Sequence, residues 1–185
     1  MQITGIVLAG GKSSRMGEDK ALLMFEGETL LKRSVKLCQS FCSSILISSN
    51  NPNHAEYGSI LVQDEIEGCG PIGGIYSCLK QSKTNWNFVV SVDSPFVNAQ
   101  FVHFMMNTIQ GFDAVVPIHS RGKEPLIALY HKNCTPVMKE LLEKKKFRMH
   151  NFLDKIKTKY LNAADALSNH PKLFYNLNSP EDLGT

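Results

Sequence analysis

Apolar and polar positions follow two alternating patterns along the chain. Short apolar runs, typical of buried strands, occupy residues 3–9, 44–48, 60–62, 87–92, 113–118 and 125–130. Apolar positions recur at helical spacing in residues 29–41, 99–109 and 135–146, and a loop at 68–74 is expected to lead into a further helix ending near Lys80. Strands that alternate with helices predict a mostly parallel sheet with helices on both faces.

The length of 185 residues suits one domain that can bury its own core. No internal repeat or linker divides the chain, so we expect a single domain over residues 1–185, a Rossmann-like three-layer α/β/α sandwich. In such sheets ligands bind beyond the carboxyl ends of the strands. The polar residues that follow Ala9, Ser48, Val62 and Val92 are therefore the first candidates for a functional site.

The loop after the first strand combines glycines with cations. Gly10 and Gly11 allow backbone N–H groups to approach an anion closely, and Lys12, Arg15 and Lys20 add positive charge. This combination favours phosphate binding over an ordinary turn with surface cations. The loop is neither a Walker A sequence nor a G-x-G-x-x-G dinucleotide motif, because the required glycines are missing.

Two carboxylates follow predicted strands. Asp93 comes after residues 87–92, where a carboxylate can bind Mg²⁺ or, alternatively, cap a helix. Asp64 comes after residues 60–62, where a carboxylate could accept hydrogen bonds from a ligand. Asn178 lies in a second polar cluster and could complete a metal shell, although the neighbouring Ser179 also fits a simple helix cap.

Residues 8–20 read L-A-G-G-x-S-x-R-M-G-x-D-K, which resembles the GT-A-like nucleotidyltransferases and, among them, the molybdenum cofactor guanylyltransferases. The likeness continues in order through residues 70–74, 93–95, 124–129 and 176–182. The resemblance implies a single α/β domain that transfers GMP from GTP to the phosphate of molybdopterin and releases pyrophosphate. It also implies a mainly nucleotide-binding half, residues 1–118, and a mainly acceptor-binding half, residues 119–185.

The resemblance assigns roles to individual residues. Catalysis would involve Arg15, Lys20 and Asp93, and the Mg²⁺ cofactor would be held by Asp93 and Asn178. GTP would be bound by Leu8, Ala9, Gly10, Gly11, Lys20, Asn50, Asp64 and Asp93. One position departs from the family, because Ser48 stands where an asparagine is common. Either Asn50 substitutes for it or the register differs, so the choice of base stays open.

The net charge of +3 is unevenly distributed. Residues 119–160 contain eleven Lys or Arg against four Asp or Glu, whereas residues 1–118 contain eight against ten. Most of these cations are expected on solvated surface. The acceptor of the family is anionic, however, and Arg121, Lys123 and Arg148 are our candidates for binding it. Nucleic acid is disfavoured, because basic and aromatic residues do not alternate in this stretch.

The chain has five cysteines, an odd number, and no two of them form a C-x-x-C motif. This pattern favours buried free thiols in a reducing cytoplasm. Cys69 lies in the Gly-rich segment, where it could be exposed. No apolar run is long enough to cross a membrane, and the first residues do not resemble a secretory signal.

Two alternative functions remain from the sequence. One is a cytidylyltransferase that acts on molybdopterin or on another phosphorylated small molecule, and the other is a non-catalytic nucleotide-binding regulator. As partners, we expect GTP and molybdopterin and, from the resemblance, a GTP-binding accessory protein. We expect neither nucleic acid nor membrane, and a monomer or weak oligomer.

Overall fold

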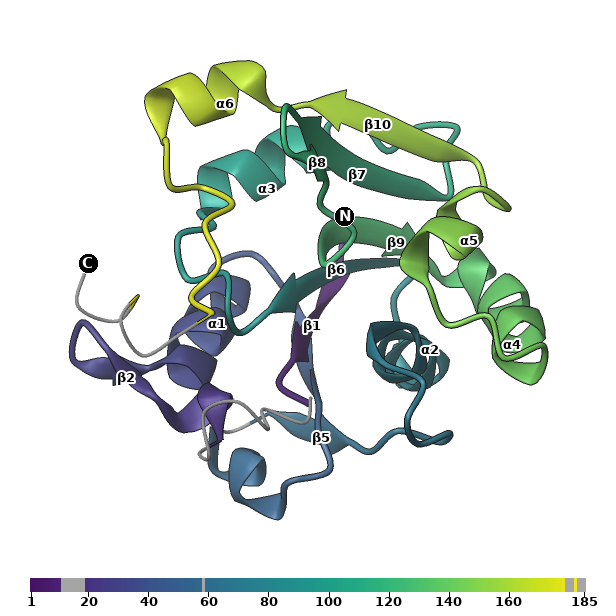
Figure 1. Ribbon diagram of the computed structural model, residues 1–185, viewed down its shortest axis with the longest axis horizontal. Coiled ribbons are helices and arrows are strands. Elements are labelled where there is room, and N and C mark those ends of the chain that lie inside the picture. The colour runs from purple at the N-terminus through teal and green to yellow at the C-terminus, as the bar shows by residue number, and fades with distance from the viewer. Residues whose placement is uncertain (11–18, 58, 179–181, 183–185) are drawn as a thin grey trace.

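The computed structural model describes residues 1–185 except 11–18, 58, 179–181 and 183–185. An eight-stranded sheet forms its centre, in the order β10-β7-β9-β6-β1-β4-β5 with β8 paired to β7 (Figure 1). Its strands are β1 Ile3–Leu8, β4 Ser44–Ser48, β5 Ile60–Val62, β6 Trp86–Ser91, β7 Ala114–His119, β8 Gly122–Lys123, β9 Ile127–His131 and β10 Thr158–Asn162. A separate hairpin pairs β2 Met24–Phe25 with β3 Glu28–Thr29.

The strand directions bring several carboxyl ends to one edge of the sheet. β1 runs parallel to β4 and β6, and β4 runs parallel to β5. β9 runs antiparallel to both β6 and β7, so β7 points the same way as β6, and β10 is parallel to β7. The prediction of a mostly parallel sheet is confirmed. β9 is reversed because only a short hairpin connects it to β7, and a parallel crossover would need a dozen or more residues.

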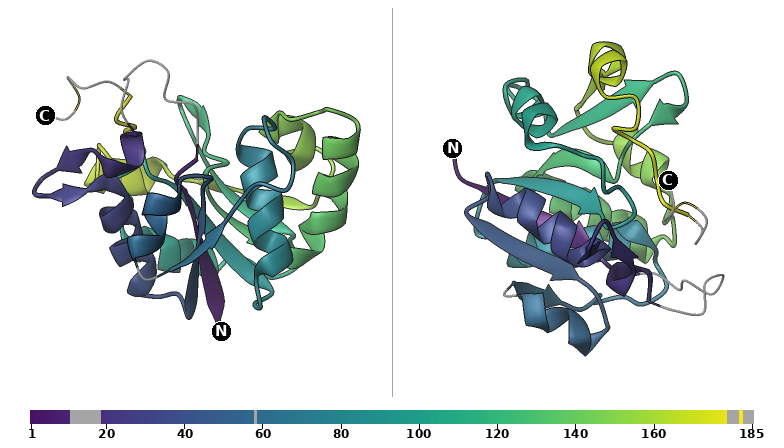
Figure 2. Two further views of the ribbon diagram at one scale, coloured as in Figure 1. Left: turned by 90° about the horizontal axis from the view of Figure 1, so that it is seen from below. Right: turned by 90° about the vertical axis from the view of Figure 1, so that its left-hand side faces the viewer.

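Helices cover both faces of the sheet, as the two further views show (Figure 2). The α-helices are α1 Leu30–Gln39, α2 Pro71–Gln81, α3 Ala99–Met106, α4 Thr135–Glu143, α5 Met149–Leu153 and α6 Ala164–Asn169. Three 3₁₀-helices complete the described elements: η1 Lys20–Leu22, η2 Pro52–Tyr57 and η3 Lys132–Cys134.

Side chains that alternate along the strands separate two cores. On β1, Ile3 and Val7 pack with α1 and α3, whereas Ile6 and Leu8 pack with α2, α4 and α5. Because successive strand residues point to opposite faces, an apolar run without alternation is the pattern of a strand buried on both sides. The three-layer prediction therefore follows directly from these runs and is confirmed.

The structure corrects several predicted elements. The segment 68–74 is not a loop throughout, because α2 already begins at Pro71 and contains Gly73 and Gly74. Proline suits the first helical turn, where its missing N–H costs nothing. The hairpin β2–β3 and the elements α5, β10 and α6 are absent from the prediction, since segments this short carry too little periodicity.

The predicted cap of α3 is confirmed. Asn98 Oδ1 accepts a hydrogen bond from Phe101 N at 2.9 Å, as its position before the apolar pattern suggests.

Candidate functional site

Backbone hydrogen bonds continue past the ends of the central strands and align the segments that follow them. Ala9 N donates to Ser48 O at 3.0 Å, and Val92 N donates to Leu8 O at 3.2 Å. Ser49 N donates to Val62 O at 3.0 Å. These bonds hold Ala9, Ser48 and the neighbours of Asp64 and Asp93 in one row, at the edge where the sequence places the nucleotide.

Lys20 and Asp93 meet at this edge. Lys20 Nζ lies 3.4 Å from Asp93 Oδ2, although the two residues are 73 positions apart. The side chains are 19% and 25% exposed, so each keeps a face toward solvent. Lys20 is the first residue of η1, and Asp19 caps that turn by accepting a hydrogen bond from Ala21 N at 3.0 Å. The loop thus ends in a defined turn that directs one cation to the acidic end of β6.

The C-terminal segment runs alongside Asp93. Leu177 N donates to Asp93 O at 2.9 Å, and Ser94 Oγ donates to Asn176 Oδ1 at 2.8 Å. Asn178 follows directly, is exposed, and donates its backbone N–H to Asp182 Oδ2 at 2.8 Å. The structure therefore brings the two predicted metal ligands, Asp93 and Asn178, onto neighbouring segments. Asn176 supports this arrangement but was missed as a site residue, although it lies in the Asn-Leu-Asn sequence that the family resemblance includes.

The chemistry of these donors fits Mg²⁺. A carboxylate and an amide oxygen are hard ligands, and Mg²⁺ commonly takes only one or two protein carboxylates together with substrate phosphates and water. Among the described residues no group of three or more His, Cys, Asp or Glu could hold a metal ion. Asp93 and Asn178 therefore suit a cation that the substrate helps to bind.

Asp64 lies beside Ser48 at the neighbouring strand ends. Ser48 Oγ donates to Asp64 Oδ1 at 3.4 Å, and Asp64 N donates to Asn50 Oδ1 at 3.2 Å. Burial raises the pKa of the Asp64 carboxyl, an effect that the Ser48 hydroxyl partly opposes. Asn50 thus supports the backbone of Asp64, and Ser48 orients its carboxylate.

Gly74 on α2 lies close to the pair formed by Ser48 and Asp64. A Cβ at Gly74 would lie 2.2 Å from Ser48 Oγ and 3.3 Å from Asp64 Oδ1. A larger residue here would have to displace the Ser48 hydroxyl from its present position. Sequence reasoning missed Gly74 as a site residue. The signal was the Gly73-Gly74 pair directly behind the helix-starting Pro71.

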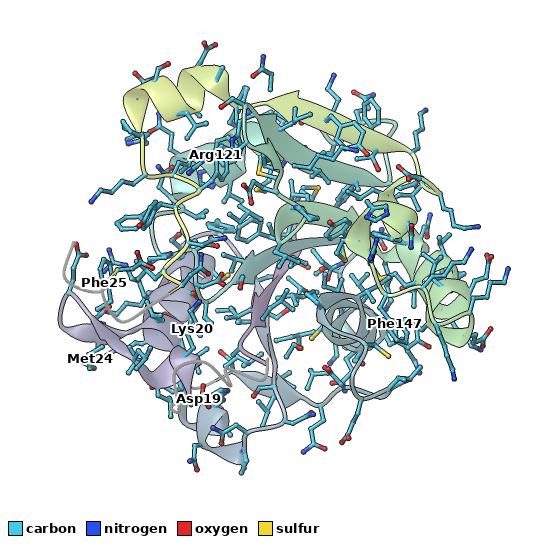
Figure 3. All side chains as sticks on the ribbon, viewed as in Figure 1. Asp19, Lys20, Met24, Phe25, Arg121 and Phe147 are labelled. Atoms are coloured by element: carbon cyan, nitrogen blue, oxygen red, sulfur yellow. The ribbon has the colours of Figure 1, made fainter. Side chains whose placement is uncertain are left out.

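The candidate acceptor residues are not gathered in one cluster. Arg121 and Lys123 belong to the β7–β8 hairpin, where Lys123 Nζ donates to Tyr160 OH at 3.0 Å and lies over that ring. Arg148 precedes α5 and is exposed. Figure 3 shows Arg121 and Phe147, the neighbour of Arg148, on different sides of the molecule, both apart from Lys20.

Two predicted residues, Gly11 and Arg15, lie outside the described residues. All five cysteines are free, and four of them are buried. Cys69 is only 2% exposed, which corrects the expectation that its loop could expose it. It lies just before α2, and its Sγ approaches Glu67 O at 3.7 Å. Burial raises the pKa of Cys69, and it raises that of Cys134 to about 12, so these thiols lack the thiolate needed for reaction.

Within the described ranges, no helix is long and apolar enough to span a membrane. Residues 5–159 match the model of the MobA-like NTP transferase domain.

A probable molybdenum cofactor guanylyltransferase of Pelotomaculum thermopropionicum is 33% identical to the chain, over 99% of the chain and 91% of the relative. A relative of the same description from Bacillus cereus strain B4264 is also 33% identical, over 97% and 93%. The molybdopterin-guanine dinucleotide biosynthesis protein A of Archaeoglobus fulgidus has the same fold, with a TM-score of 0.83 at 23% identity over 98% of the chain and 95% of that protein. The chain therefore belongs to the MobA-like NTP transferase family and is a nucleotidyltransferase.

Proposed function

We propose that the chain transfers GMP from GTP to the phosphate of molybdopterin, which yields the guanine dinucleotide cofactor and pyrophosphate. The observation that carries this proposal is the meeting of Lys20 and Asp93, a cation and a potential metal ligand, at the carboxyl edge of the sheet. The descriptions of the relatives as probable molybdenum cofactor guanylyltransferases support the choice of substrates.

In the proposed reaction an oxygen of the acceptor phosphate forms a bond to the α-phosphorus of GTP. The bond between that phosphorus and the pyrophosphate oxygen breaks, and pyrophosphate leaves with the electron pair. The acceptor phosphate is already ionised at neutral pH, so the chain needs no general base. Its task is to position the two phosphates and to stabilise the developing charge.

Lys20 supplies positive charge to the α-phosphate and the leaving group. Its 3.4 Å distance from Asp93 is longer than the roughly 2.7–2.9 Å of a closed charge-assisted hydrogen bond, so its ammonium group stays available to phosphate oxygens. Because Ala9 N already donates to Ser48 O, the backbone N–H groups offered to the phosphates in this proposal are those of Gly10 and Gly11, and Arg15 adds a second cation. The roles of Gly11 and Arg15 rest on the sequence alone.

Asp93 and Asn178 would hold Mg²⁺. When bound, the ion neutralises charge on the phosphates and orients them for in-line attack. Asp93 is suited to this role because its backbone is anchored to Leu177 while its carboxylate faces Lys20.

Asp64 would read the base. On one edge of guanine, an amino group and a ring N–H can both donate hydrogen bonds to a carboxylate. The corresponding edge of cytosine has only an amino group as donor. Ser48 and Asn50 hold Asp64 in place for this contact. The half formed by residues 119–185 would bind the acceptor, through Arg121, Lys123 and Arg148. A GTP-binding accessory protein, a monomeric or weakly oligomeric state and a cytoplasmic location remain predictions.

The test is pyrophosphate release by the purified chain with molybdopterin and Mg²⁺, with GTP and CTP compared at equal concentration. We expect release with GTP and its loss when Mg²⁺ is removed by a chelator. Release with CTP alone would replace the proposal by a cytidylyltransferase.

Two further results would point elsewhere. GTP binding without pyrophosphate release, in the presence of a verified acceptor, would favour a nucleotide-binding regulator. Salt-dependent retardation of nucleic acid in a gel would revive a nucleic-acid binder.

A further inference from the structure

His54 is a buried residue that the proposed mechanism does not use. It lies in η2, the turn that follows β4, and its side chain is 0% exposed. Its Nε2 atom lies 3.0 Å from Asp19 Oδ2, which is close enough for a hydrogen bond. Neither ring nitrogen, however, makes a hydrogen bond of good geometry with a described residue. A buried polar group with unused hydrogen-bonding capacity is costly and calls for an explanation.

Asp19, which His54 approaches, caps the turn that carries Lys20. Asp19 Oδ1 accepts the hydrogen bond from Ala21 N that caps η1, and Asp19 Oδ2 accepts from Asn51 Nδ2 at 2.5 Å. Asp19 thus joins the start of η1 to the segment after β4. Because Lys20 is the next residue and the first of η1, a rotation of the Asp19 carboxylate would redirect the Lys20 side chain.

The segment that presents His54 is itself held in place. Asn51 N donates to Ser49 Oγ at 3.0 Å, and His54 N donates to Asn51 O at 3.2 Å. At the other end of η2, Tyr57 OH and Thr29 Oγ1 lie 3.0 Å apart within hydrogen-bond geometry. The imidazole therefore approaches Asp19 from a fixed backbone, as a positioning group should.

We propose that His54 is a positioning residue for the transfer reaction. Through Asp19 it holds the η1 turn in the orientation that directs Lys20 to the phosphates. The contact at 3.0 Å closes into an aligned hydrogen bond when the nucleotide is bound, since contacts in a free enzyme are often poorly aligned and tighten in the substrate complex. This inference rests on the proposed function through the role given to Lys20.

The first test compares His54→Leu with His54→Gln in the full chain. His54→Leu removes the donor, and a displacement of Lys20 should lower kcat for pyrophosphate release by roughly tenfold to a hundredfold, with a smaller change in KM for GTP. The side chain of glutamine can place an amide N–H near the position of Nε2, so His54→Gln should restore most of kcat.

A double-mutant cycle shows whether His54 acts through Asp19. Asp19→Ala should lower kcat by itself, and adding His54→Leu should cause little further loss. The matched control is His131→Leu at the opposite edge of the sheet, where His131 pairs with Trp86 and accepts a hydrogen bond from Asn133 N. This control should lower Tm and leave kcat unchanged.

A second measurement does not depend on activity. The amide of Ala21, which Asp19 caps, should exchange hydrogen faster in His54→Leu than in the wild type, and His131→Leu should leave that exchange unchanged. Unchanged exchange at Ala21, or wild-type kcat in His54→Leu, would overturn the inference. Free-energy losses in kcat from His54→Leu and Asp19→Ala that add in the double variant would also overturn it. If the wild type releases no pyrophosphate but the exchange at Ala21 still differs between His54→Leu and the wild type, the proposed function is refuted. The action of His54 on the η1 turn through Asp19 would then still be supported.

Discussion

The two halves of the carboxyl edge differ in how their charged side chains are held. On the proposed nucleotide side, Lys20 and Asp93 come from distant parts of the sequence and meet in a partly buried pair. On the proposed acceptor side, Arg121 and Arg148 are exposed and lie on separate elements. The nucleotide side is therefore organised before substrate arrives, whereas the acceptor side offers a diffuse positive charge.

This difference shows that a sequence motif and a charge excess predict a binding site with different precision. The family resemblance assigned Lys20 of the motif in residues 8–20 and Asp93 to one site, and the fold brings the two side chains together. The excess of cations in residues 119–160 predicted only a sign of charge, because composition carries no information about which side chains share a surface. Four predictions test this contrast.

The largest effect is expected from removing either member of the pair Lys20 and Asp93. Lys20→Ala and Asp93→Ala should each lower kcat by roughly a hundredfold or more, because each removes charge stabilisation that the transition state needs. Pyrophosphate release measures this, and Tm confirms that the variants fold. Lys139→Ala, which removes an exposed cation 3.9 Å from Glu143, serves as the control. Near-normal turnover in either variant would remove that residue from the mechanism.

The next effect concerns the approach of α2. In Gly74→Ala the new methyl group forces Ser48 Oγ away from Asp64, so we expect a loss of about 1–3 kcal/mol in stability and weaker GTP binding. Denaturant unfolding and calorimetric titration with GTP measure the two quantities. The double variant Ser48→Ala with Gly74→Ala should recover part of the stability. If Gly74→Ala alone behaves like the wild type, the close approach has no energetic consequence.

A smaller effect is expected from removing the charge of Asp64. Burial raises its pKa in the folded state above the unfolded value, so the folded chain takes up a proton more readily. The associated stabilisation is complete below the unfolded pKa and is lost as pH rises through the folded pKa. Asp64→Asn should therefore raise Tm at pH 7, by no more than about 2–4 °C, and should weaken GTP binding.

Melting curves at pH 4 and pH 7 check the sign of this prediction. The Tm advantage of Asp64→Asn should be smaller at pH 4 than at pH 7, because the raised pKa lets the wild-type carboxyl take up its proton as the pH falls. A constant advantage across this range would show that the charge of Asp64 is not its cause.

The smallest effects belong to the acceptor side. Arg121→Ala and Arg148→Ala should each raise KM for the acceptor by roughly twofold to fivefold, because exposed charges contribute about 0–1 kcal/mol. The KM for GTP should not change, and the effect should diminish with salt. A hundredfold loss from either substitution would show that the acceptor side is as organised as the nucleotide side.

The sequence by itself determined the layers of this protein and most of its central strands, because continuous apolar runs permit only a sheet buried on both faces. It also predicted a phosphate-binding loop, since Gly10 and the cations after it lie within one short segment. The ranges 44–48 and 60–62 agree with the observed β4 and β5 residue by residue.

Only the tertiary structure decided which distant side chains meet. The pairing of Lys20 with Asp93, the contact of His54 with Asp19, and the space that Gly74 leaves for Ser48 all join segments far apart along the chain. Such contacts depend on strand order and on the depth of each helix. Periodicity reports which face of an element is buried, but not which residue it will touch.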